Sequence, residues 1–140
     1  MIAVLVDSDP RYHMSHPLLK SAVEECLKKH RVSGKVEVGV SIVGDRKMQE
    51  LNLRFRKRDK TADVLSFPLE DPTSPGADQK HHGFVRPPDH VLRLGDVVVS
   101  YPQAMAAAAE DNMVVEDEIV FLVQHGVEHL LGIHHEEELQ

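Results

Sequence analysis

The chain has 140 residues, of which 41% are hydrophobic, 28% charged and only 4% aromatic. This length and composition predict one globular domain with a largely aliphatic core, and they exclude a disordered chain. The net charge of −7 excludes a general polyanion-binding surface, but residues 1–60 carry a net charge of +5 and residues 61–140 carry −12. A local basic patch can therefore still attract nucleic acid, although solvated helix faces explain the same charges.

Membrane and disulfide features are missing from the sequence. No apolar run approaches the roughly 20 residues that a transmembrane helix needs. The first residues, 1–7, lack the basic region of a signal peptide. Cys26 is the single cysteine, so no internal disulfide can form. These features predict a soluble cytoplasmic protein with no membrane or disulfide partner.

Strands and helices alternate in the first part of the chain. Residues 2–6 form an apolar run typical of a strand, and apolar residues over 17–30 recur at helical spacing. Residues 36–43 alternate as a second strand, and Asp45 is suited to cap the helix that follows. That helix carries Met48, Leu51, Asn52 and Phe55.

The second part of the chain continues this mixture. Residues 64–67 predict a short strand, and residues 94–100 predict a buried one. Between them, residues 71–93 contain four Pro, two Gly and three His, which predicts a long mobile loop. Two helices are predicted over 102–111 and 116–131. The intermixed elements predict a mixed α/β or α+β domain with one sheet.

Histidines near the C-terminus have the spacing of a metal site. His125 and His129 are four residues apart, so their rings project from one face of a helix. Gly132 can end this helix in the left-handed conformation, and the turn allows His135 to return as a third ligand. Three imidazoles with an open fourth position are typical of catalytic zinc, although nickel, cobalt or copper also suit them. The alternative is a surface cluster of histidines at a helix end.

The spacing H-x3-H-x2-G-x2-H matches the metal-binding half of the metzincin pattern. Zincin proteases place a Glu general base directly after the first His, where this chain has Gly126, so a protease is disfavoured. Glu128 lies about 100° from His129 around the helix and is expected to face away. A metal held by three neutral imidazoles can lower the pKa of bound water to about 7. This chemistry suits a phosphate ester, provided that cations stabilise the phosphoryl oxygens.

A basic segment precedes the strand predicted over 64–67. Its five cations within seven positions are Arg54, Arg56, Lys57, Arg58 and Lys60. Because a guanidinium group donates two hydrogen bonds to phosphate at once, this segment is a candidate RNA-binding surface. The alternative is a solvated helix C-terminus, where the helix dipole favours cations.

Four further polar residues have two interpretations each. Asp96 can accept the ring N–H of a ligand histidine, or it can cap a turn at a strand end. His134, beside the third ligand, can support the metal site or transfer protons, or it can simply be exposed. Asp63 and Ser66 stay open between a site role and a structural role.

Three segments of the sequence together resemble the bacterial YbeY family of metal-dependent endoribonucleases. They are LNLRFRKRDKTADVLSFP (51–68), LGDVVVS (94–100) and HGVEHLLGIHH (125–135). These blocks occur in the family's order and at similar separations. The resemblance implies an α+β fold in a single domain over residues 1–140, with a mixed β-sheet packed by helices and a zincin-like grouping.

The resemblance also implies a zinc-dependent endoribonuclease that acts on single-stranded RNA. The family role is rRNA processing at the 3′ end of small-subunit rRNA, with ribosome quality control, so the implied partners are rRNA and the ribosomal small subunit. The implied site has one metal per chain and an active-site arginine at Arg56. Its implied ligands are His125, His129 and His135. The family usually reads H-G-x-L-H-L-x-G-x-D-H, so Glu128 and His134 depart from its pattern.

Two other functions stay open. A non-catalytic ribosome-assembly factor would use the metal to staple the C-terminus and the basic helix to bind rRNA, so it would bind RNA without cleaving it. A hydrolase of small phosphoesters or amides would turn over a nucleotide or peptide and show no salt-dependent affinity for RNA.

Overall fold

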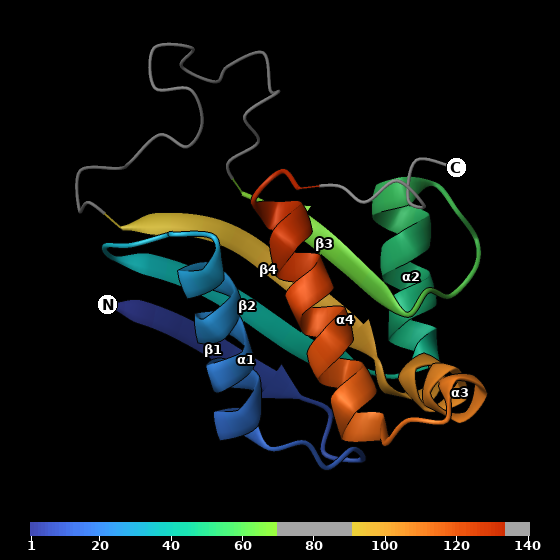
Figure 1. The fold of residues 1–140 in the computed structure, drawn as a ribbon. Helices are drawn as coiled ribbons and strands as arrows, with labels where there is room; N and C mark the ends of the chain where they lie inside the picture. The colour runs from blue at the N-terminus through green and yellow to red at the C-terminus, as the bar shows by residue number, and fades with distance from the viewer. Residues whose placement is uncertain (70–90, 134–140) are drawn as a thin grey trace.

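A computed structural model describes residues 1–69 and 91–133 of the chain. Its elements are, in order, β1 (Ile2–Ser8), α1 (His16–Lys29), β2 (Val36–Val43), α2 (Asp45–Arg56), β3 (Val64–Pro68), β4 (Leu92–Ser100), α3 (Tyr101–Asp111) and α4 (Val115–Leu130). Figure 1 shows these elements arranged around one sheet. The predicted α+β fold is confirmed, whereas its zincin-like grouping stays a prediction.

The sheet has the strand order β1–β2–β4–β3 and is mixed, as predicted. Strands β1, β2 and β4 are parallel neighbours, and β3 pairs antiparallel with β4 at one edge. Parallel neighbours need a crossover connection, which α1 supplies between β1 and β2. None of the helices in the described ranges is long and apolar enough to cross a membrane.

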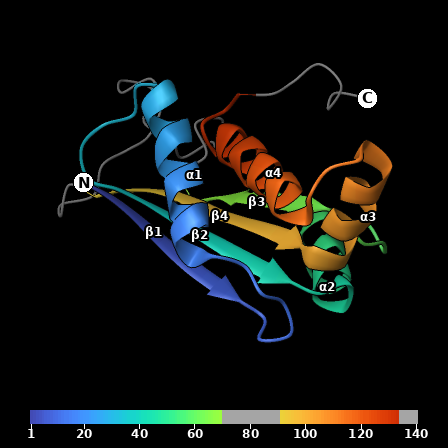
Figure 2. The ribbon, with the colours of Figure 1, turned by 60° about the horizontal axis from the view of Figure 1, so that its bottom comes forward.

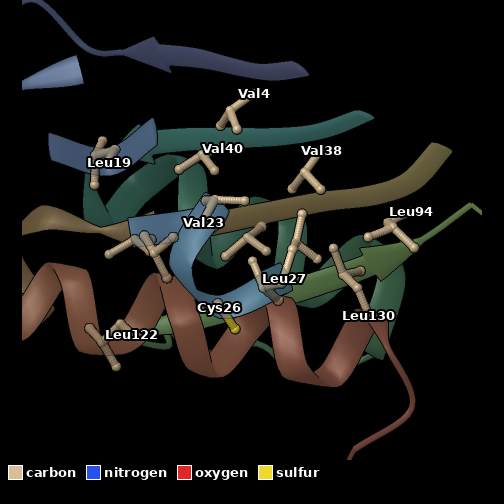
Figure 3. Close-up of a cluster of buried hydrophobic side chains, with 14 of the residues drawn as sticks. Val4, Leu19, Val23, Cys26, Leu27, Val38, Val40, Leu94, Leu122 and Leu130 are labelled. Carbon is tan, nitrogen blue, oxygen red and sulfur yellow. The ribbon is translucent and has the colours of Figure 1, made fainter. Parts of the chain in front are cut away.

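The main core lies between the sheet and the pair α1 and α4, which cover one of its faces (Figures 2 and 3). Alternate residues of β2 point into this core and are at most 1% exposed: Val36, Val38, Val40 and Ile42. Helix α1 supplies Leu19, Val23 and Leu27 to the same core. Its N-terminus is fixed by Ser15, whose Oγ accepts a hydrogen bond from the N–H of Leu18 at 3.2 Å. The core thus holds α4 in place over β4 and β3.

Helix α2 packs on the opposite face through a smaller cluster of Met48, Leu65 and Val98. The prediction that Asp45 caps this helix is wrong, because Gly44 is the N-cap and Asp45 is the first helical residue. The Asp45 carboxylate instead accepts hydrogen bonds from Thr61, Ser100 and Gln103. These partners tie α2 to β4 and α3.

A β-bulge interrupts β4 beside Gly95. The register with β2 changes from Glu37 opposite Arg93 to Val38 opposite Gly95. Gly95 has a φ of 135° and a Cβ there would overlap the carbonyl oxygen of Phe67, so a side chain is disfavoured. The bulge shifts the alternation of side chains in the rest of β4.

Strand β4 begins at Leu92, inside the segment that was predicted as a loop over 71–93. The N–H of Leu92 donates to the carbonyl oxygen of Lys35 at 2.8 Å, which starts the pairing with β2. The remainder of the predicted loop, up to residue 90, lies outside the described residues.

Candidate active site

Helix α4 places His125 and His129 on one side, as their spacing predicts. Their ring centroids are 5.0 Å apart with 43° between the ring planes. The Nε2 atom of His129 is buried, and the His125 ring is partly buried. Two imidazoles one helical turn apart are donors that suit a borderline divalent metal. The described part of the predicted ligand set therefore fits a metal ion.

The end of α4 turns the chain sharply through a Schellman motif. The N–H groups of Gly132 and Ile133 donate to the carbonyl oxygens of His129 and Glu128 respectively, both at 2.9 Å. Gly132 has a φ of 82°, the left-handed conformation that glycine adopts without steric cost. The predicted helix end is confirmed. The predicted third ligand, His135, and its neighbour His134 lie outside the described residues.

Gly126 allows α4 to lie directly against the sheet. A Cβ at this position would be 2.5 Å from Cγ1 of Val97 and 3.1 Å from Oγ of Ser66. The Ser66 hydroxyl donates to the carbonyl oxygen of Gly126 at 3.0 Å, which ties β3 to the helix. The glutamate that zincin proteases have at this position would not fit against Val97 in this packing.

A cleft of about 200 Å³ opens beside the two histidines, next to edge strand β3. Its lining comes from the C-terminal end of α2, from the start of β3 and from α4: Arg56, Asp63, Val64, Ser66, His125, Gly126 and His129. The fold thus brings Arg56 together with the two histidines. It also places Asp63 and Ser66, whose roles the sequence left open, in the lining of the cleft. Asp63 presents an exposed carboxylate to the cleft, and Ser66 holds the helix in place.

Arg56 is the last residue of α2 and the member of the basic segment that lines the cleft. The chain turns at Lys57, which has a φ of 60° and ends the helix. The other cations of the segment are exposed around this turn: Arg54, Lys57, Arg58 and Lys60. These four residues, here called the basic rim, lie within four positions of Arg56 in the chain.

Asp96 lies away from the histidines. Because of the bulge, its carboxylate lies against Gly39 of β2, whereas Val97 faces α4. Asp96 lines a groove of about 340 Å³ on the sheet face opposite α1 and α4, together with Glu37 and Arg93. The structure therefore does not support a hydrogen bond from His125 or His129 to Asp96, and a contact with His135 stays a prediction.

Two neighbours complete the surroundings of His125 and His129. The Phe121 ring stacks on His125 with 5.8 Å between centroids and 28° between planes. No sequence pattern singled out Phe121, although its position four residues before His125 is the signal for a shared helix side. Glu128 faces away, as predicted, with its Oε2 at 2.8 Å from Nε2 of His30, the C-cap residue of α1.

The chain is similar to known proteins in sequence and in fold. The family model described as endoribonuclease YbeY matches residues 8–140. An endoribonuclease YbeY from Roseiflexus sp. (strain RS-1) is 42% identical over 124 residues, which cover 89% of this chain and 72% of that protein. One from Dehalococcoides mccartyi is 38% identical over 138 residues, covering 97% and 78%. The solution structure of TM1509 from Thermotoga maritima gives a TM-score of 0.55 at 30% identity, covering 97% of this chain and 75% of that one.

Proposed function

Because the chain belongs to the endoribonuclease YbeY family, we propose that it is a metal-dependent hydrolase of RNA phosphodiester bonds whose active site is the cleft between α2, β3 and α4. The observation that carries this proposal is the convergence of Arg56, His125 and His129 on one cleft from two helices. A phosphate-binding cation and a pair of imidazole ligands are the groups that metal-assisted phosphodiester hydrolysis needs.

The residues that would hold the metal are His125, His129 and His135. The proposed ion is Zn²⁺, one per chain in this cleft, and nickel or another divalent ion also suits imidazole. The 5.0 Å separation of the rings of His125 and His129 supports a shared ion. When bound, the metal lowers the pKa of water and offsets the charge on the phosphate.

The protein's own side chains supply binding and proton transfer in this proposal. Arg56 donates two hydrogen bonds to the phosphoryl oxygens, and its charge stabilises the transition state. Asp63 supplies a carboxylate in the cleft that can accept a proton from the attacking water. The Ser66 hydroxyl already donates to Gly126, so a role as nucleophile is disfavoured.

Single-stranded RNA is the proposed substrate. The basic rim of four cations can contact successive phosphates, which positions the strand. Phe55 and Phe121 are each 56% exposed, one beside Arg56 in sequence and the other stacked on His125. Exposed aromatic rings stack unpaired bases, which a duplex does not offer.

We extend the proposal to rRNA processing in the cytoplasm. The chain would mature the 3′ end of small-subunit rRNA and act in ribosome quality control. Its partner would be the ribosomal small subunit. The family resemblance supports this extension. Cells whose only copy of the gene encodes His129→Ala should accumulate small-subunit rRNA with unprocessed 3′ ends. Normal 3′ ends in those cells would contradict this role.

The test of the activity is cleavage of a labelled single-stranded RNA by the full chain. We expect cleavage to stop with a chelator, to return when Zn²⁺ is added, and to be lost together with the cleft metal in His129→Ala. The matched control is His13→Ala, which changes an exposed histidine between β1 and α1 and should behave as wild type. Full cleavage by His129→Ala that has lost the cleft metal would overturn the proposal. RNA binding without cleavage by the zinc-loaded wild type would favour the assembly factor.

A further inference from the structure

A second polar cluster lies between α1 and α4, on the side of α4 away from the cleft. Cys26 lies in the last turn of α1 and His30 is the C-cap residue of this helix, and Glu128 meets them from α4. Figure 3 shows the Cys26 sulfur directed toward α4. Its Sγ–H donates to the carbonyl oxygen of Gln124 at 3.6 Å. The three potential ligand atoms of Cys26, His30 and Glu128 lie within 4.8 Å of one another.

We propose that Cys26, His30 and Glu128 form a second divalent-metal site, separate from the histidine cleft and suited to zinc-like ions. A thiolate, an imidazole and a carboxylate are each ligands of Zn²⁺. The sulfur disfavours Mg²⁺ and Ca²⁺, which prefer oxygen ligands. The donor set therefore specifies the chemical class of the ion.

A cavity next to the cluster gives the ion an entrance and a place for a fourth ligand. Its volume is about 170 Å³, and it is lined by Glu25, Cys26, Lys29, Gln124 and Glu128. The side chains of His30 and Glu128 are 22% and 15% exposed, so the cluster is within reach of solvent. A water molecule or a side chain at the cavity can complete a tetrahedral set.

Small side-chain movements convert the present arrangement into a coordination shell. Bonds of about 2.0 to 2.3 Å place the donor atoms of a tetrahedral zinc ion about 3.5 Å apart. The His30 and Glu128 atoms, at 2.8 Å, have to separate slightly, and the Cys26 sulfur has to approach them. These shifts are small enough for side-chain rotation, because the three atoms already lie within 4.8 Å of one another.

Charge balance favours a divalent ion at this position. The thiol of Cys26 releases its proton to solvent when the sulfur–metal bond forms, and Nε2 of His30 binds through its lone pair. The thiolate and the Glu128 carboxylate then offset the two positive charges of the ion.

Lys29 lines the cavity, and its positive charge opposes binding of a cation, so Lys29→Gln should tighten metal binding. The bound ion would clamp α1 to α4, the helix that carries His125 and His129.

Cobalt titration of the full chain tests the site, because a cobalt–thiolate bond gives a charge-transfer absorption in the near ultraviolet that an all-histidine site lacks. Cys26 is the single cysteine, so this band reports the second site alone. We expect the band in wild type, His129→Ala and Lys29→Gln, and its loss in Cys26→Ser and Cys26→Ala. Glu128→Gln should weaken Co²⁺ binding at least tenfold. Absence of the band in wild type with excess Co²⁺ would overturn the inference.

Zinc content after dialysis separates this inference from the proposed function. We expect two zinc ions per wild-type chain, one in Cys26→Ser and one in His129→Ala. A single wild-type ion that is lost in His129→Ala and kept in Cys26→Ser would reject the second site and leave the cleft proposal intact. An ion kept in His129→Ala and lost in Cys26→Ser would support the second site and contradict the proposed cleft metal.

Discussion

Helix α4 presents two different polar surfaces to its two sides. Toward β3, His125 and His129 face a cleft of about 200 Å³ that also contains Arg56. Toward α1, Gln124 and Glu128 contact the buried Cys26 and the partly buried His30. Helical periodicity separates the pairs, since residues 124 and 128 lie about 100° from residues 125 and 129.

The comparison shows how neighbouring residues on one helix acquire different tasks. On the α1 side the polar groups are satisfied by the adjacent helix, so they hold the two helices together. On the β3 side the cleft exposes cations and a carboxylate to solvent, where a substrate can reach them. Substitutions toward β3 should therefore change the rate of cleavage, and substitutions toward α1 should change the stability of the fold.

The largest expected effect is on the cleft side. Arg56→Ala should slow RNA cleavage by about 100-fold to 1,000-fold, because a preorganised donor to the developing phosphate charge is lost. The variant should keep its metal content and its free energy of unfolding. The matched control is Arg46→Ala, an exposed arginine in the first turn of the same helix. An unchanged cleavage rate in Arg56→Ala would remove this residue from the mechanism.

On the α1 side, the pKa of the Cys26 thiol is raised to about 11. Burial is the larger cause, and the nearby Glu128 carboxylate is the smaller one. In chelator-treated protein at pH 8, alkylation of Cys26 should be at least about 100-fold slower than in the urea-unfolded chain, since the thiolate is the nucleophile. Rates measured with iodoacetamide test this expectation. Equal rates in the folded and unfolded chains would contradict a buried thiol in this position.

The same thiol makes stability depend on pH in a defined direction. Above about pH 8.5 the unfolded chain loses the thiol proton while the folded chain retains it. The free energy of unfolding should therefore fall as the pH rises from about 8.5 toward 11, and it should fall less in Cys26→Ala. A Cys26→Ala variant with the same slope as wild type would show that other groups cause the loss.

Gly126 of α4 tests how closely this helix packs against the sheet. Gly126→Ala should cost about 1 to 3 kcal/mol of stability, because the added Cβ would press on the Val97 side chain. Gly132→Ala, with nothing within 4 Å of its Cβ but a φ of 82°, should cost about 1 to 2 kcal/mol through backbone strain alone. Urea unfolding measures both values. A wild-type stability for Gly126→Ala would contradict the close approach of α4 to the sheet.

The smallest expected effect concerns the hydrogen bond between Glu128 and His30 on the α1 side. In metal-free protein, Glu128→Gln should lower stability by about 1 kcal/mol, since His30 loses a charged hydrogen-bond partner at the border of solvent. Cleavage by zinc-loaded Glu128→Gln should stay within about twofold of wild type, because Glu128 faces away from the cleft. A large loss of cleavage with unchanged stability would reverse the assignment of the two sides.

Local patterns in the sequence predicted the elements well. The helix predicted over 116–131 is observed as Val115–Leu130, and its end at Gly132 follows from the conformational freedom of glycine. The pairing of His125 and His129 on one side follows from helical spacing alone. Features determined within a few residues of the chain were therefore predictable.

Features that depend on contacts between distant segments were not predictable in this way. The bulge at Gly95 arises from the pairing of β4 with both neighbours, and it alone moves Asp96 to the other face. The carboxylate of Asp45 binds Ser100 and Gln103 rather than its own helix. Convergence of Arg56 with the histidines was implied by the family resemblance, because no local pattern connects α2 with α4.

Anomalous diffraction from crystals of the full chain grown with Zn²⁺ tests the central claim most directly. A metal-dependent cleft predicts a zinc peak about 2 Å from a ring nitrogen of His125 and of His129, on the side of α4 that faces Arg56. Ordered rings that share no zinc peak, in crystals where zinc is abundant, would contradict it.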